Sequence, residues 1–169
     1  RHEPLATVVL RFFDGGRAPC GVTESNGVPW ATAYAGCPVI FAAGGGGALI
    51  STEAAATSAP GWPWVSPLYP ERLSGKPRLL ARGVAQAPFV DPSHMQTRQP
   101  RTAVGLDAAG HRVVFLVADG RRPDAAGMTA WEMVDAFVAE GITEAMNLDG
   151  GGSSTLWIDG VVVNRPSDG

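Results

Sequence analysis

Short apolar segments alternate with turn signals over residues 101–169, and this alternation constrains the fold more than any other feature of the chain. Asp107-Ala108-Ala109-Gly110 and Asp159-Gly160 have the composition of hairpin turns. The 22 glycines and 14 prolines among 169 residues argue for short elements and against a helical bundle. Strands are predicted at residues 101–106, 111–118, 145–148, 155–158 and 161–164.

One helix is predicted within this region, and it begins at residue 130. Thr129 and Glu132 have the spacing of a capping box, in which a hydroxyl and a carboxylate bind free N–H groups at the start of a helix. Gly141 has the position of a residue that ends a helix. The apolar residues on one helical face are Ala130, Met133, Val134, Phe137 and Val138.

The first hundred residues are less regular. Residues 5–13 and 38–42 are apolar and predict two strands. The four glycines at 44–47 predict a hairpin tip, and no Lys-Ser/Thr follows them, which excludes a P-loop. Residues 54–76 and 86–100 contain several prolines and predict surface loops.

The order of these elements predicts an α+β domain, close to the α/β class, with few helices and a mixed β-sheet. We expect glycine-rich turns of an active site at the strand ends, and a single domain over residues 1–169. The net charge of −3, without a basic face, argues against a nucleic-acid partner. No apolar run reaches the length of a membrane span. The sequence leaves both a monomer and an oligomer open.

The two cysteines, Cys20 and Cys37, leave two alternatives open. Either they are buried free thiols, or in an exported protein they form one disulfide. Their spacing is not that of a zinc site, and no metal or cofactor is expected. Asp119 and Asp149 together could still hold a calcium ion.

The sharpest functional signal is the segment 147–155, Asn-Leu-Asp-Gly-Gly-Gly-Ser-Ser-Thr. A predicted strand delivers Asp149 at its end, and three glycines then allow a tight turn whose backbone can approach a ligand closely. The N–H groups of such a turn can bind an anion, and the two serine hydroxyls can bind sugar or phosphate oxygens. From composition alone, a solvated surface turn is the alternative.

Four segments together resemble the phosphodiester glycosidase family. They are PRTAVGLDAAGHRVVFLVADGR at 100–121, GMTAWEMVDAF at 127–137, NLDGGGSSTL at 147–156 and NRPSDG at 164–169. LSGKPRLLARGV at 73–84 is similar more weakly. Val9-Leu10-Arg11 stand where the family has an Asn-Gly-Gly motif, which removes one expected substrate contact. The resemblance also implies that the domain lacks its last strand.

The resemblance implies hydrolysis of a sugar from a sugar phosphodiester, with release of a free sugar and a phosphomonoester. Asp149 is then the nucleophile or the base for water, and Asp119 is the partner acid or base. Either carboxylate could instead cap a turn. Arg101 is the first candidate to stabilise the leaving phosphate, and Arg121 and Arg122 are the next. A surface arginine paired with an acid is the alternative for Arg101.

The other substrate-binding residues that the resemblance implies come from the same segments. They are Thr102, Asn147, Gly150, Gly151, Gly152, Ser153, Ser154, Ser167 and Asp168. The expected partner is a small molecule or a glycan with a sugar–phosphate group, and the expected location is secreted, at the cell surface or periplasmic. The alternative is a carbohydrate- or phosphate-binding module with impaired catalysis, which the missing Asn-Gly-Gly motif favours. Nucleotide binding is disfavoured, because no Gly-x-Gly-x-x-Gly opens a helix.

Overall fold

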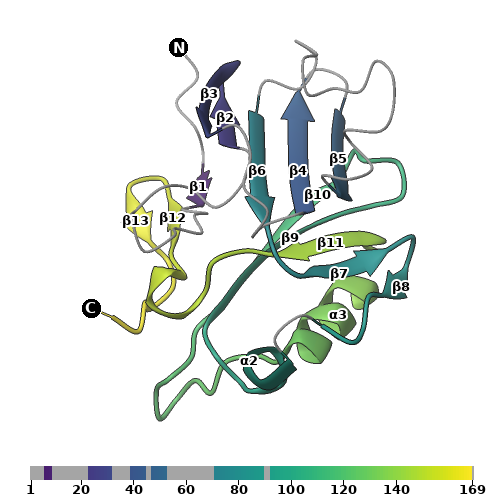
Figure 1. Ribbon diagram of the computed structural model, residues 1–169. Helices are drawn as coiled ribbons and strands as arrows, with labels where there is room; N and C mark the ends of the chain where they lie inside the picture. The colour runs from purple at the N-terminus through teal and green to yellow at the C-terminus, as the bar shows by residue number, and fades with distance from the viewer. Residues whose placement is uncertain are drawn as a thin grey trace.

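The computed structural model of the chain describes residues 6–8, 23–31, 39–44, 47–52, 71–89 and 92–168. This part of the chain forms two five-stranded sheets and one three-stranded sheet, with two α-helices (Figure 1). Cys20, Cys37 and the segment Val9-Leu10-Arg11 lie outside the described residues, so the expectations about them stay predictions.

The first five-stranded sheet, here called the N-terminal sheet, has the order β3-β2-β6-β4-β5. Its strands are β2 (Thr23–Ser25), β3 (Val28–Ala31), β4 (Val39–Gly44), β5 (Gly47–Thr52) and β6 (Glu71–Gly75). The second, here called the central sheet, has the order β10-β9-β11-β7-β8. Its strands are β7 (Arg78–Ala81), β8 (Val84–Ala85), β9 (Arg101–Leu106), β10 (Val113–Ala118) and β11 (Glu144–Asn147). The small sheet contains β1 (Ala6–Val8), β12 (Leu156–Ile158) and β13 (Val161–Val162).

Every strand pair among the described residues is antiparallel, so the prediction of a mixed sheet is wrong for this part of the chain. β10 and β11 do run in the same direction, because both are antiparallel to β9. The connection that carries helix α3 (Ala130–Ala139) joins these two strands, but β9 lies between them and no parallel pair forms. The chain is mostly β-sheet with few helices, in keeping with the α+β class.

The central sheet is covered on both faces. All six residues of β9 are buried, and alternate side chains point to opposite faces of the sheet. Val104 and Leu106 belong to the core between the central and N-terminal sheets. Ala103 packs on the other face, in one cluster with Phe137 of α3, which lies beneath the sheet in Figure 1. This burial fixes β9, whose first residue is Arg101.

Helix α3 begins and ends as its sequence predicts. The Thr129 hydroxyl accepts a hydrogen bond from the Glu132 N–H (3.2 Å), and the Glu132 carboxylate accepts one from the Thr129 N–H (2.8 Å). These bonds hold the pKa of Glu132 below its usual value, and the Thr129 N–H contributes most. Gly141 follows the helix with φ +72° and donates to the Val138 carbonyl (3.0 Å). The capping box and the glycine stop are confirmed.

The hairpins predicted from turn signals are also confirmed. β9 and β10 pair along their whole length, from Arg101 opposite Ala118 onward. Asp159 and Gly160 both have positive φ, as a two-residue turn between β12 and β13 requires. The β4–β5 pairing extends to Gly44 opposite Gly47, which are the first and last of the four glycines.

Both predicted loops of the first half contain regular structure that their prolines concealed. The loop predicted at 54–76 ends in β6, which pairs with β2 and β4. The loop predicted at 86–100 contains the short helix α2 (Pro92–Gln96). Of the helices in the described residues, none is long and apolar enough to cross a membrane.

Candidate active site

A cavity of about 340 Å³ lies where β9 begins and β11 ends. Its walls come from the turn before β7, from α2, from the loop after β10 and from the glycine turn after β11, which includes a short 3-10 helix, η2 (Gly151–Ser153). Six of the predicted site residues line the cavity: Arg101, Arg121, Asn147, Asp149, Gly150 and Gly151.

Asp149 supplies the carboxylate of this cavity. Its Oδ1 accepts a hydrogen bond from the Gly150 N–H (2.9 Å). Partial burial raises the pKa of Asp149 above its usual value, because desolvation disfavours the charged form, while hydrogen bonds from Ser153 and Gly150 oppose the shift. Among the described residues that line the cavity there is no second carboxylate. A partly buried carboxylate with a shifted pKa in a cavity is a candidate for catalysis.

The glycine turn brings its backbone very close to other parts of the chain. A Cβ on Gly150 would lie 2.8 Å from the Pro100 carbonyl oxygen, and one on Gly152 would lie 1.9 Å from the Asp168 carboxylate. Gly151 has φ +62°, a conformation that favours glycine, and donates its N–H to the Pro100 carbonyl (2.9 Å). Space and conformation therefore explain why the turn needs glycine.

Replacing Gly150 with Ala is expected to destabilise the protein, because the new methyl group would press on a backbone oxygen that cannot move without β9. An overpacked site of this kind costs about 1–3 kcal/mol, which lowers the melting temperature by several degrees. Thermal unfolding of the variant measures the effect. Val161→Ala, at an exposed position of β13, is the control and should leave the melting temperature nearly unchanged. An unchanged melting temperature for Gly150→Ala would contradict this account of the turn.

Arg101 is almost fully buried, with 1% of its surface exposed. Its Nε donates to the Met128 carbonyl (2.9 Å), and its Nη2 donates to the carbonyls of His94 (2.7 Å) and Thr97 (2.9 Å). No ion pair of the described residues involves Arg101, so the alternative of a surface arginine paired with an acid is wrong. Burial lowers the pKa of Arg101, and the nearby charge of Arg121 adds to this effect.

Arg121 is the more accessible of the two cations. A Cβ on Gly151 would lie 3.1 Å from the Arg121 guanidinium, so this side chain lies over the glycine turn. Its Nε donates to the Gln99 side chain (2.8 Å), and its Nη1 lies 3.8 Å from the Asp168 carboxylate. The backbone of Arg121 has φ +58°, a strained conformation for a residue with a side chain and one that occurs often at functional sites.

Asn147 holds an unpaired polar atom at the cavity. Its side chain is 2% exposed, and its Nδ2 donates to the carbonyls of Lys76 and Leu148 (2.8 Å each). Its Oδ1 is buried and accepts no hydrogen bond, the only such side-chain atom found among the described residues. Native proteins leave few buried acceptors unpaired, so this atom is unusual in a residue that lines a cavity.

Most of the predicted hydroxyl groups are used within the protein. Thr102 and Ser154 are buried, and the Thr102 hydroxyl donates to the Ser154 oxygen (3.2 Å). The Ser167 hydroxyl donates to Asp168 (3.0 Å), whose carboxylate lies next to Gly152. None of these side chains lines the cavity, so they shape its surroundings.

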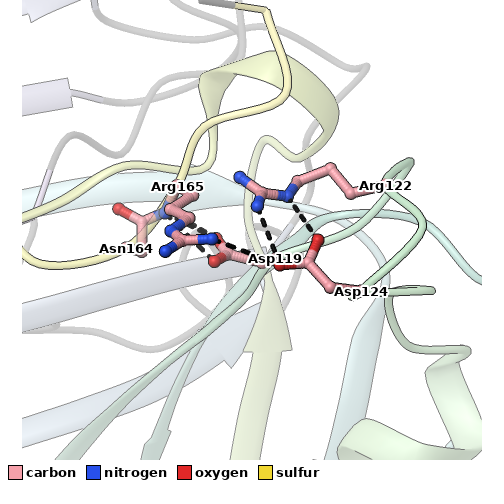
Figure 2. Close-up of polar contacts among 5 residues, drawn as sticks. All are labelled: Asp119, Arg122, Asp124, Asn164 and Arg165. Atoms are coloured by element: carbon pink, nitrogen blue, oxygen red, sulfur yellow. Dashed lines mark hydrogen bonds and ion pairs between the residues drawn. The ribbon is translucent and has the colours of Figure 1, made fainter.

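Asp119 and Arg122 lie in a separate polar cluster after β10 (Figure 2). Asp119 accepts hydrogen bonds from residues 164–165, and Arg122 donates twice to Asp124 (2.9 Å each). Neither residue lines the cavity, so Asp119 and Asp149 are not brought together as a candidate calcium site. No group of three or more His, Cys, Asp or Glu side chains in the described part of the chain is placed to hold a metal ion.

Among the described residues that line the cavity, five were not predicted as site residues: Lys76, Pro77, His94, Met95 and Leu148. Lys76 and Pro77 belong to the segment at 73–84 that resembles the family only weakly, and that resemblance was the available signal. His94 and Met95 lie in α2, where a loop was predicted, and no spacing pattern connected them to the glycine turn.

Comparisons with known proteins point to one family. The family model for phosphodiester glycosidase matches residues 5–169. An uncharacterized SPbeta prophage-derived protein of Bacillus subtilis is 40% identical over 75 residues, which are 44% of this chain and 12% of that protein. Human N-acetylglucosamine-1-phosphodiester alpha-N-acetylglucosaminidase is 41% identical over 68 residues, which are 40% of this chain and 13% of that protein.

Solved structures show the same fold. The zebrafish N-acetylglucosamine-1-phosphodiester alpha-N-acetylglucosaminidase catalytic domain, auto-inhibited by its pro-peptide, matches with a TM-score of 0.75 and 24% identity, over 96% of this chain and 56% of that chain. A hypothetical protein of Synechocystis matches with a TM-score of 0.63 and 15% identity, over 96% and 49% of the two chains. A Burkholderia pseudomallei protein assigned as exported matches with a TM-score of 0.50 and 22% identity, over 80% and 36%. The chain thus spans little more than half of the zebrafish chain and a small part of its curated relatives.

Proposed function

Because this chain belongs to the phosphodiester glycosidase family, we propose that it hydrolyses the bond between the anomeric carbon of a sugar and a phosphodiester oxygen, releasing a free sugar and a phosphomonoester. One observation carries the proposal: among the described residues, a single carboxylate, that of Asp149, lines the same cavity as two arginines, Arg101 and Arg121. The reaction needs a carboxylate at the sugar and positive charge at the leaving phosphate.

In this mechanism, the charged form of Asp149 attacks the anomeric carbon, or removes a proton from the water that attacks it. The carbon–oxygen bond breaks, and its electron pair goes to the phosphate oxygen. If Asp149 is the nucleophile, water then hydrolyses the bond between Asp149 and the sugar, which releases the free sugar and restores the carboxylate. A phosphomonoester is a good leaving group, so positive charge serves where other glycosidases need a proton donor. Arg121 is exposed enough to reach the phosphate, and Arg101 adds a second, fixed charge. The names of the human and zebrafish relatives support a phosphodiester substrate.

The sugar is proposed to bind beside Asn147. The unpaired Oδ1 of Asn147 can accept a hydrogen bond from a sugar hydroxyl or an amide N–H. A buried acceptor without a donor costs about 1–3 kcal/mol, so a ligand that supplies the donor recovers part of this free energy on binding. Asn147 therefore favours a sugar over a phosphate ester without hydroxyl groups.

The proposal is tested with a sugar 1-phosphodiester that carries a chromogenic group on the phosphate. Cleavage at the anomeric carbon leaves this group on the phosphomonoester, and the released sugar is detected directly. Release of the sugar by the unmodified protein supports the proposed hydrolysis. Binding measured by calorimetry without release would favour the alternative of a binding module with impaired catalysis. The proposal is overturned if the protein neither binds nor hydrolyses any of a panel of such diesters.

Arg121→Gln is expected to impair the phosphodiester substrate selectively. Loss of one guanidinium at the leaving phosphate should lower kcat/KM for a sugar phosphodiester about 30- to 300-fold, or about 2–3.4 kcal/mol. An aryl glycoside of the same sugar, whose leaving group has no phosphate, should lose less than about threefold. Arg98→Gln is the control, because Arg98 is an exposed arginine paired with Glu132 outside the cavity. Equal losses on both substrates would show that Arg121 does not recognise phosphate.

The expected location and partner remain part of the proposal. We propose an exported protein, secreted, at the cell surface or periplasmic, and the assignment of the Burkholderia pseudomallei protein as exported supports this. The expected partner is a small molecule or a glycan that carries a sugar–phosphate group. Sugar release from whole glycans and from small diesters, measured side by side, distinguishes the two.

A further inference from the structure

Asp119 directly follows β10, and each of its carboxylate oxygens lies within hydrogen-bond distance of a donor (Figure 2). Its Oδ1 accepts a hydrogen bond from the Asn164 side chain (3.0 Å), and both of its oxygens lie 3.0 Å from the Arg165 N–H. Asp119 does not line the cavity. An acid or base must reach the proton that it transfers, within hydrogen-bond distance or through one water. This position does not suit a direct role in proton transfer.

Asn164 connects Asp119 to the glycine turn. Its Nδ2 donates a second hydrogen bond, to the Ser154 carbonyl (2.8 Å), and its Oδ1 accepts one from the Leu156 N–H (2.7 Å). Both protons of Nδ2 are therefore used, one for Asp119 and one for Ser154. We call Asp119, Ser154, Leu156, Asn164 and Arg165 the Asn164 network.

Ser154 carries this connection toward the carboxylate of the cavity. Ser154 is buried, its N–H donates to the Gly151 carbonyl (3.1 Å), and its hydroxyl accepts from Thr102 (3.2 Å). Asp149 stands at the other end of the same turn, where its Oδ1 accepts a hydrogen bond from the Gly150 N–H. The Asn164 network thus fixes one end of the turn that begins at Asp149.

We propose that Asp119 is a positioning residue, which acts through Asn164 to hold the glycine turn and, with it, Asp149. This inference rests on the proposed function, since positioning is defined here by its effect on that reaction. Holding a reacting group in place matters greatly for rate, and a misplacement of about 1 Å can cost about a hundredfold.

The other ion pairs of the cluster in Figure 2 do not reach the turn. Asp124 accepts two hydrogen bonds from Arg122 (2.9 Å each) and one from Arg165 (3.2 Å), and its side chain is 58% exposed. Exposed pairs of this kind contribute little to stability. Asp124 is therefore a matched control: a carboxylate of the same cluster without a bond to Asn164.

The test compares Asp119→Asn, Asp119→Ala and Asn164→Ala, with Asp124→Asn as the control. An amide oxygen at residue 119 can still accept from Asn164, so Asp119→Asn should keep kcat within about tenfold of the unmodified protein. Asp119→Ala and Asn164→Ala should each lower kcat about a hundredfold with little change in KM. The kcat of the Asp119→Ala/Asn164→Ala double variant should be no lower than that of the less active single variant, because both substitutions break the same connection.

The pH profile separates positioning from proton transfer. Asp119→Asn should keep both limbs of the kcat/KM profile if Asp119 only positions the turn. If Asp119→Asn is as inactive as Asp119→Ala and loses one limb, Asp119 is the partner acid or base and the inference is overturned. Full activity of Asn164→Ala would overturn it as well.

Amide hydrogen exchange tests, without any substrate, whether Asp119 and Asn164 hold the backbone of the network in place. The N–H groups of Leu156 and Arg165 should exchange faster in Asp119→Ala, and that of Leu156 faster in Asn164→Ala, while Asp124→Asn leaves both unchanged. Unchanged exchange of Leu156 in Asp119→Ala would overturn the inference. If the unmodified protein hydrolyses no sugar phosphodiester, the proposed function fails by itself, and exchange still reports on the Asn164 network.

Discussion

Asp149→Asn is expected to lower kcat at least about a thousandfold, or about 4 kcal/mol of activation free energy. The amide keeps the shape of the side chain and can still accept the hydrogen bond from Gly150. It cannot attack the anomeric carbon or take a proton from water, because it lacks the negative charge. Turnover is measured on a sugar 1-phosphodiester, and circular dichroism verifies that the variant is folded. Near-normal turnover in the folded variant would exclude Asp149 as nucleophile or base.

Asp135→Asn is the matched control for this change. Asp135 is exposed on α3 and does not line the cavity, so this substitution changes the net charge by the same amount without touching the site. We expect its turnover to equal that of the unmodified protein. A similar loss in both variants would point to a general effect of charge.

The raised pKa of Asp149 predicts opposite effects of pH on activity and stability. Activity needs the charged carboxylate, so the acidic limb of kcat/KM should lie above the usual range of aspartate. The folded state holds this proton more tightly than the unfolded chain, so the stability that Asp149 contributes at low pH is lost as the pH rises through its raised pKa. Asp149→Asn should therefore be at least as stable as the unmodified protein at neutral pH, and the difference should disappear in acid. A lower melting temperature at neutral pH would contradict the shift.

Arg101→Leu is expected to lower the free energy of unfolding by about 3 kcal/mol or more, because it removes three hydrogen bonds from a charged group, and such bonds contribute about 1.5–3 kcal/mol each. Three carbonyls, those of His94, Thr97 and Met128, each lose one hydrogen bond in this variant. The His94 carbonyl keeps the bond from the Thr97 hydroxyl, and the Met128 carbonyl keeps the bond from the Gln99 N–H. Urea denaturation measures the change. Arg121→Leu is the control for stability, since Arg121 bonds mainly to one exposed side chain and should lose less than about 1 kcal/mol.

The effect of Arg101 on the reaction is measured with Arg101→Lys, which keeps the charge but loses the planar guanidinium and its fixed set of N–H donors. We expect kcat/KM for the phosphodiester to fall by about 2–4 kcal/mol, and kcat/KM for the matching aryl glycoside to fall much less. Equal losses on both substrates in a stable variant would show that Arg101 only supports the structure. Arg121 would then be left as the residue that binds the phosphate.

Where structure depends on neighbours in the sequence, the sequence by itself determined the outcome. Thr129, Glu132 and Gly141 set the ends of α3, because caps involve residues only a few positions apart. Asp159 and Gly160 specified a two-residue turn, since few residues adopt positive φ. The placement of Asp149 at the end of a strand before a glycine turn was predicted in the same way, and the family resemblance is carried by these local segments.

Only the tertiary structure decided which of these elements meet. The sequence could not show that β9 lies between β10 and β11, because strand pairing depends on the packing of distant apolar faces. It presented Asp119 and Asp149 as a catalytic pair, each followed by glycine at a strand end, yet their partners come from different parts of the chain. Asp119 bonds to Asn164, 45 positions away, and Asp149 lies in the cavity. The environment of a carboxylate depends on residues that are distant in the sequence, and a local sequence pattern contains no information about them.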